Sequence, residues 1–376
     1  MKVAIVHDWL SQSGGAEQVL EVLHQMYPQA PIYTSVYVQD RMPPAYRRWD
    51  IRTSFMQRIP LVKNYLQPFF FLYPLAFQRM YLADYDLVIS NSSGFCHGVV
   101  VSPSTCHINY CLTPPRFLWN VEHYLEREQM GSLLKQLLPW LVRPLRDWDF
   151  AVAQRVSHFV GISQAVVGRI KKCYGRDAAL IYPPVDTSRF SPTAETDDYF
   201  LIVSRLVPYK RVDLAVRAFN ELGLPLLIVG EGRDRKALEA MAQPNIRFLG
   251  RFPFADVQRL LPRCRAFIFP GEEDFGIAPL EAQAAGRPVI AYAAGGALET
   301  VIDGETGLFF TQPTPESLIE AILRFQGKTF DSVPIRRHAE RFDTRRFIEN
   351  LGGFVARQMA AHHPGATLVG KGKSDA

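Results

Sequence analysis

The stretch Gly271-Glu272-Glu273-Asp274-Phe275-Gly276-Ile277-Ala278-Pro279-Leu280-Glu281 carries the most specific information in this chain. Three acids precede a glycine at which we expect a helix to begin. A helix N-terminus attracts phosphate through its free N–H groups and partial positive charge, whereas carboxylates repel phosphate. A ligand with an anionic end and a hydroxyl-rich end fits both features. The anionic end binds the helix N-terminus, and the hydroxyl groups donate hydrogen bonds to the carboxylates, which are strong acceptors. A sugar joined to a nucleoside diphosphate is such a ligand.

The acids also have a purely structural interpretation. Acidic residues in the first turn of a helix stabilise it by about 0.3–1 kcal/mol each. The acidic trio alone therefore leaves both interpretations open, and the rest of the chain has to decide between them.

The second half of the chain alternates short apolar runs with helical stretches, which predicts a doubly wound parallel sheet that binds ligands at the carboxyl ends of its strands. The expected strands are Tyr199–Val203, Leu226–Val229, Ile246–Leu249, Ala266–Phe269, Val289–Ala291 and Gly307–Phe310. The polar and glycine motifs all follow these runs: Ser204-Arg205, Gly230-Glu231-Gly232, Gly250-Arg251, Pro270–Gly276 and Ala294-Gly295-Gly296. This clustering places the site at one edge of the second sheet.

Two cations lie in the first of these loops. Arg205 and Lys210 follow the run Tyr199–Val203, and a diphosphate needs cations of this kind. Taken alone, the two residues would be explained better as solvated surface cations.

The first half predicts a second unit of the same kind. Val3–Val6, Leu87–Ser90 and His107–Cys111 are its expected strands, and Gly14 and Gly15 form a flexible loop before a helix that begins at Ala16. Strand, glycine loop and helix bring backbone N–H groups close to an anion, but a plain tight turn is the alternative. The expected divisions are residues 1–182 and 183–335, joined at Tyr182–Asp186, a returning helix at 336–360, and a disordered tail at 361–376.

Charge and aromatic residues suggest a surface partner. The net charge of the chain is +5, and residues 1–180 account for the whole excess, because they contain 18 Lys and Arg and 13 Asp and Glu. Aromatic and basic residues interleave at 55–81 and 133–150. Such segments can lie in a membrane interface, although aromatic helices are more often core. We expect no nucleic acid partner.

Several other features point to a cytosolic protein without a metal. The five cysteines form no CxxC pair, so we expect reduced thiols. No signal peptide or membrane-spanning run is visible. Asp84-Tyr85-Asp86 and Asp147-Trp148-Asp149 spell DxD, a pattern that binds manganese in some enzymes of a different fold. Neither lies on the ligand edge of the second half, and we interpret both as chance.

Together these motifs resemble family 4 glycosyltransferases. The second half is similar over nearly its whole length, through SRLVPYKR, VGEG, EEDFGIAPLEAQAAGRPVIA and GGALE. The first half is similar more loosely, through HDWL, the glycine pair and YCLTPPRFLW. These last motifs resemble a bacterial subgroup that builds surface polysaccharide and often uses GDP-mannose.

The resemblance implies an α/β GT-B fold, in which two Rossmann-like doubly wound domains face each other across a cleft. It implies retaining transfer without cofactor or metal, from GDP-mannose in preference to UDP-sugars, to a polyprenyl-diphosphate-linked oligosaccharide at the inner face of the cytoplasmic membrane. The implied catalytic residues are Glu273, Arg205, Lys210 and His97, and Arg116 is the implied acceptor residue. The implied donor site adds Gly14, Gly15, Gly230, Glu231, Gly250, Arg251, Asp274, Phe275, Gly276, Ile277 and Glu281.

One departure from the family pattern concerns a histidine. Many members carry a histidine on the loop after the strand Leu87–Ser90, whereas here His97 is displaced by several residues and Leu112 replaces another histidine of the subgroup. This departure keeps open a nucleotide-sugar-binding partner subunit without activity. A sugar-nucleotide epimerase on the same fold is a further alternative, against which the spacing of Glu273 and Glu281 argues.

Overall fold

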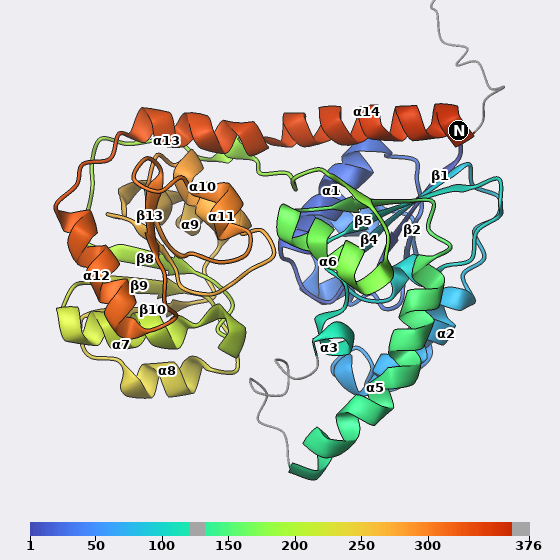
Figure 1. The fold of residues 1–376 in the computed structure, drawn as a ribbon, viewed down its shortest axis with the longest axis horizontal. Coiled ribbons are helices and arrows are strands. Elements are labelled where there is room, and N and C mark those ends of the chain that lie inside the picture. The colour runs from blue at the N-terminus through green and yellow to red at the C-terminus, as the bar shows by residue number, and fades with distance from the viewer. Residues whose placement is uncertain (121–131, 363–376) are drawn as a thin grey trace, which may run out of the picture.

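The computed structural model describes residues 1–120 and 132–362. Figure 1 shows two lobes side by side, each built around one parallel sheet with helices packed against it. The expected fold class, two Rossmann-like sheets in an α/β protein, is confirmed by these sheets.

The first lobe contains a seven-stranded sheet in the order β3-β2-β1-β4-β5-β6-β7, and all of its pairs are parallel. Its central strands β4 and β5 are buried along their whole length, as expected for a sheet covered on both faces. The strands are β1 (Val3–His7), β2 (Ile32–Thr34), β3 (Ile51–Thr53), β4 (Leu87–Ser92), β5 (Cys106–Cys111), β6 (His158–Gly161) and β7 (Ala178–Leu180). The helices are α1 (Gly15–Met26), α2 (Tyr73–Gln78), α3 (Arg116–Trp119), α5 (Ser132–Ala153) and α6 (Gln164–Tyr174).

The second lobe contains a six-stranded parallel sheet in the order β10-β9-β8-β11-β12-β13. All six predicted strands are present, with bounds that differ by one residue at most. They are β8 (Phe200–Val203), β9 (Leu226–Val229), β10 (Ile246–Gly250), β11 (Phe267–Phe269), β12 (Val289–Tyr292) and β13 (Gly307–Phe310). The helices are α7 (Val212–Leu222), α8 (Arg235–Met241), α9 (Phe254–Leu260), α10 (Ile277–Ala284), α11 (Ala297–Thr300), α12 (Pro315–Gln326) and α13 (Ser332–Ala339).

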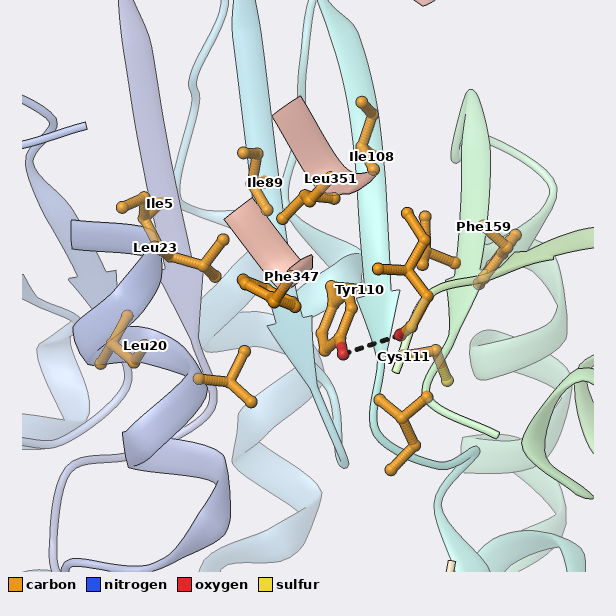
Figure 2. Packing of buried hydrophobic residues seen from close by; sticks show 14 of the residues in the cluster. Ile5, Leu20, Leu23, Ile89, Ile108, Tyr110, Cys111, Phe159, Phe347 and Leu351 are labelled. Atoms are coloured by element: carbon orange, nitrogen blue, oxygen red, sulfur yellow. Dashed lines mark hydrogen bonds between the residues drawn. The ribbon is translucent and has the colours of Figure 1, made fainter. Parts of the chain in front are cut away.

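The last described helix, α14 (Thr344–His362), returns to the first lobe. Figure 1 shows α13 beside the second lobe and α14 beside the first, one after the other along the same side of the molecule. Figure 2 shows its Phe347 and Leu351 beside Ile89 and Ile108 of the first sheet, in the same core as Tyr110, whose hydroxyl donates to the carbonyl oxygen of Ile181 at 3.0 Å. Burial of each such apolar side chain stabilises the fold by about 1.5–3 kcal/mol.

The expected single helix at 336–360 is wrong in one respect, because the chain breaks it between α13 and α14. Asp343 accepts a hydrogen bond from the backbone N–H of Arg345 at 3.0 Å and from the hydroxyl of Thr187 at 2.6 Å. An aspartate in this position caps the helix that follows it, so a new helix starts there. The expected tail begins within α14, and its residues 363–376 lie outside the described part of the chain.

The aromatic segment at 55–81 combines the two roles that its sequence left open. Met56, Val62, Tyr73 and Phe77 are buried in the first lobe. Other large apolar side chains of the segment are exposed: Leu61 by 66%, Tyr65 by 62%, Phe71 by 45%, Leu75 by 42% and Tyr81 by 72%. Part of the segment is therefore core, and part is unburied apolar surface.

Candidate functional site

The predicted loops of the second lobe meet at one edge of its sheet, because all six strands are parallel and their carboxyl ends point the same way. Glycines let these loops approach each other closely. A Cβ atom at Gly271 would lie 2.7 Å from the carbonyl oxygen of Tyr209, and one at Gly296 would overlap the backbone of Phe275. The backbone N–H of Gly296 donates to the carbonyl oxygen of Glu273 at 2.9 Å. The loops after β8, β11 and β12 thus form one packed cluster.

Two of the predicted charged residues meet in this cluster. The Lys210 ammonium forms an ion pair with the Glu273 carboxylate, and both side chains are mostly buried, with exposures of 14% and 21%. Arg205 lies in the same loop as Lys210 and donates to the hydroxyl of Tyr209 at 2.6 Å. Cation and carboxylate therefore lie side by side at the ligand edge, as a ligand with one anionic and one hydroxyl-rich end requires.

The glycine pair of the first lobe lies against the same cluster. A Cβ atom at Gly15 would be 2.9 Å from Cδ1 of Ile277, the first residue of α10. Gly14 precedes α1 as its N-cap, and Gly276 holds the matching position before α10, with a φ of 98° that favours glycine. The loop of the first lobe and the acidic loop of the second thus face each other directly.

Glu281 lines a cavity of about 130 Å³ between the lobes, together with Gln18, Glu21 and Arg189. Burial raises the pKa of Glu281 to about 7, against the opposing effects of a hydrogen bond from Gln18 and the charge of Arg189. With a pKa near 7, the carboxyl is ionised in part at neutral pH, and only the ionised form can accept hydrogen bonds from a hydroxyl-bearing ligand with both oxygens.

The remaining predicted donor residues lie further along the edge. The backbone N–H of Gly230 donates to the carbonyl oxygen of Gly250 at 2.8 Å, so the loops after β9 and β10 are joined. Glu231 forms an ion pair with Arg235 on the helix that follows. Arg251 is exposed. These residues extend the cluster away from Lys210 along the sheet edge.

Three contacts between the lobes had no signal in the sequence. Asp274 forms ion pairs with Arg116, at 2.5 Å, and with Arg169, which lies on α6. Glu299 accepts hydrogen bonds from the backbone N–H of Gln164, at 2.9 Å to each carboxylate oxygen. An arginine on an amphipathic helix is usually solvated, and pairs more than 100 residues apart leave no local pattern, so Arg169 and Gln164 could not be identified from sequence.

Asp8, at the end of β1, is a further residue that the sequence analysis did not assign. Its carboxylate is 2% exposed and accepts hydrogen bonds from the backbone N–H groups of Ser93 (2.7 Å), Phe95 (2.8 Å) and Cys96 (2.8 Å). It therefore fixes the loop after β4, next to the glycine loop. The signal was the HDWL motif itself, an acid directly after a buried strand.

The assignment of His97 as a catalytic residue is not supported by its position. The ring is buried in the first lobe, 3% exposed, and its Nε2 lies 3.2 Å from Oδ1 of Asp149. Asp149 also accepts from the Nε1 of Trp119 at 2.7 Å and from the hydroxyl of Tyr174 at 2.9 Å. The histidine faces this internal carboxylate because the chain turns inward after β4, and it does not reach the loop cluster.

The two DxD patterns are placed away from the cluster as well. Asp149 is the buried acid just described, and Asp86 accepts from the backbone N–H of Lys2 at 2.7 Å, at the opposite edge of the first sheet. Within residues 1–120 and 132–362 no three His, Cys, Asp or Glu side chains gather as metal ligands would. In the same part of the chain, no helix combines the length and apolar character needed to cross a bilayer.

Two facing Rossmann-like lobes with charged loops at the sheet edge between them form the GT-B fold. Residues 185–329 match the sequence family described as Glycosyl transferases group 1, so this part of the chain is similar to the members of that family. The likeness is of the family 4, mannosyltransferase-like type.

Relatives and solved structures agree with this assignment. A GDP-mannose-dependent monoacylated alpha-(1-6)-phosphatidylinositol monomannoside mannosyltransferase of Corynebacterium glutamicum is 32% identical over 220 residues, which span 50% of this chain and 56% of that one. The O-antigen chain mannosyltransferase of Salmonella typhimurium is 27% identical over 36% of this chain and 42% of its own. The chain thus aligns with about half the length of these relatives. An Anabaena protein, HepE, crystallised with UDP-glucose, shares the fold with a TM-score of 0.69 at 18% identity, over 95% of this chain and 100% of its own.

The raised pKa of Glu281 predicts a pH-dependent nucleotide affinity. If ribose hydroxyls donate to the ionised carboxylate, binding is favoured above pH 7 and releases a proton below it. Between pH 6 and pH 8 the ionised fraction of a group with pKa about 7 rises roughly tenfold, so we expect the Kd for GDP to fall by up to about tenfold. Calorimetry in two buffers of different ionisation enthalpy measures both the affinity and the proton release.

The matched variant is Glu281→Gln, which removes the titration but keeps the shape of the side chain. The phosphate of GDP also titrates near this pH, so the difference between wild type and variant is the informative quantity. Equal pH dependence in both proteins would show that Glu281 does not bind the nucleotide. The same raised pKa lowers the free energy of unfolding as the pH rises from about 4.5 to about 7, because the native state holds the proton more tightly than the unfolded chain.

Proposed function

We propose that this protein is a retaining glycosyltransferase that needs no metal and transfers a sugar, with mannose from GDP-mannose favoured, to a polyprenyl-diphosphate-linked oligosaccharide in surface polysaccharide synthesis. The observation that carries the proposal is the Lys210–Glu273 ion pair at the edge where the two lobes face each other. The group 1 domain and the mannosyltransferase relatives support the class of reaction.

The charges fit the chemistry of glycosyl transfer. Breaking the bond between a sugar and a diphosphate places positive charge on the sugar and negative charge on the leaving group. Glu273 offers a carboxylate to the first, and Lys210 and Arg205 offer cations to the second. These cations supply the charge that a metal ion would bring in other transferases. We infer that the departing phosphate takes the proton of the acceptor hydroxyl.

The direct test is transfer of sugar from GDP-mannose, UDP-glucose and their analogues to lipid-linked acceptors in the presence of EDTA. The product anomer is then read by NMR. We expect chelator-resistant transfer with retention. An inverted anomer would contradict the mechanism, and loss of turnover with EDTA would contradict metal independence. Conversion of the donor without any acceptor would instead identify an epimerase, and donor binding without transfer would identify a non-catalytic subunit.

A lipid-linked acceptor requires the enzyme to work at a membrane, and we propose the inner face of the cytoplasmic membrane. The exposed apolar side chains at 61–81 and the basic residues beside them support this location: Arg58, Lys63 and Arg79 are all exposed. Each basic residue near an anionic bilayer contributes about 1 kcal/mol of attraction, which salt screens.

We therefore expect the protein to sediment with anionic vesicles at low salt and to be released at high salt. The triple variant Leu61→Ser, Tyr65→Ser and Phe71→Ser should reduce the bound fraction by at least about fivefold, because these side chains lose their apolar area. Leu323→Ser is the matched control, since Leu323 is 53% exposed on the second lobe. Equal vesicle binding by the triple variant and wild type would place the membrane contact elsewhere.

A further inference from the structure

The acidic loop is held from two sides. Glu273 and Asp274 are neighbours in the chain, but their carboxylates have partners on different lobes. Glu273 pairs with Lys210 of its own lobe, whereas Asp274 pairs with Arg116 and Arg169 of the first lobe. The residue proposed to face the donor sugar thus directly precedes a residue that the other lobe holds.

Several charged side chains from both lobes surround Asp274. Its carboxylate is 18% exposed, and a single oxygen, Oδ1, takes both guanidinium groups. Arg169 also donates to the hydroxyl of Thr113 at 3.2 Å and lies 3.9 Å from the carboxylate of Glu272. This cluster contains two positive side chains and two negative ones: Arg116, Arg169, Asp274 and Glu272. Its net charge is zero, so it lacks the excess positive charge that a phosphate-binding site needs.

A second contact holds the same helix. The carboxylate of Glu299 accepts both of its 2.9 Å hydrogen bonds from the N–H of Gln164, at the first residue of α6, while Arg169 lies one turn further along. An anion is favoured at this end of a helix. The loop after β11, through Asp274, and the helix α11, through Glu299, therefore each contact α6, the helix of the first lobe that faces the second lobe in Figure 1.

We propose that Arg169 and Arg116 are positioning residues for the transfer reaction: acting through Asp274, they set the loop that carries Glu273 from the opposite lobe. This inference rests on the proposed function. This role does not require either arginine to touch the donor. Each one orders the backbone of 272–276 so that the Glu273 carboxylate is in place when the sugar arrives, and an error of about 1 Å in such a group costs up to about 100-fold in rate.

The test is a mutant cycle on Arg169→Gln and Asp274→Asn. We expect each single variant to lower kcat by about 10- to 100-fold, while the Kd for GDP measured by calorimetry changes by less than about threefold. Since both residues act through one contact, the double variant should be no worse than the more damaged single variant. Arg169→Lys should restore part of the rate, and Lys172→Gln, an exposed position on the same helix, should change nothing.

Hydrogen exchange supplies a readout that does not depend on turnover. The amides of 272–276 should exchange faster in Arg169→Gln than in wild type, while those of β4 and β5 stay protected. Multiplicative losses in the double variant, unchanged exchange in the loop, or a raised acceptor KM with unchanged kcat would overturn the proposal; the last would assign the arginines to acceptor binding. If wild type transfers no sugar, the proposed function fails, and the exchange experiment still decides whether the arginines order the loop.

Discussion

Replacing Lys210 by alanine should lower kcat by about 100- to 1000-fold, the cost of removing one preorganised charge from the point where negative charge develops. The variant loses the cation that faces the leaving diphosphate, and it leaves Glu273 without the partner that holds its carboxylate. Steady-state rates with a saturating nucleotide sugar measure the effect. Lys210→Arg should retain more of the rate, because it keeps the charge but changes the geometry.

The matched control is Lys328→Ala, which removes an exposed lysine from the same lobe and should leave the rate unchanged. Glu273→Gln tests the other member of the pair, and it too should lose at least about 100-fold in kcat, because an amide cannot balance the charge on the sugar. Rates within about threefold of wild type for either variant would remove that residue from the proposed chemistry.

Replacing Asp8 by alanine should destabilise the first lobe by about 3–5 kcal/mol, because three backbone N–H groups, two buried and one partly buried, lose their acceptor at once. The melting temperature should fall by roughly 6–20 °C, if the lobe unfolds as a unit of its own. Scanning calorimetry and near-UV circular dichroism measure this loss.

Asp84→Ala is the matched control, because Asp84 is an exposed aspartate on the same lobe; its effect should stay within about 0.5 kcal/mol. Asp8→Asn should have an intermediate effect, since its carbonyl oxygen still accepts while its amide group faces other donors. A melting temperature for Asp8→Ala within 2 °C of wild type, by the scale of about 2–4 °C per kcal/mol, would contradict the anchoring role.

The second lobe was predictable from sequence because its strands are apolar, regularly spaced and followed by polar loops. The first lobe was less predictable. Its strands β2 and β3 have three residues each, too few for a periodic pattern, and β3 is mostly exposed. The missed strands β6 and β7 are also short. Local periodicity therefore indicated the existence of the lobe but not its full strand order.

The site divides in the same way. The motif residues follow consecutive parallel strands, so the rule that ligands bind at strand carboxyl ends was enough to bring Lys210 and Glu273 together. The contacts of Arg169 and Glu299 depend on how two lobes face each other, which no spacing along the chain encodes. His97 shows the converse. Its place in the sequence suggested a catalytic role, but the side chain points into the first lobe and lies beside Asp149.

The return of α14 to the first lobe has a consequence for synthesis. Phe347, Leu351, Phe354 and Val355 complete a core whose other members lie mostly before residue 186. During translation the amino-terminal lobe emerges early, yet part of its apolar surface stays uncovered until α14 has left the ribosome. The first lobe is thus synthesised before the second but completes its core after it. The second lobe can fold before α14 packs against the first.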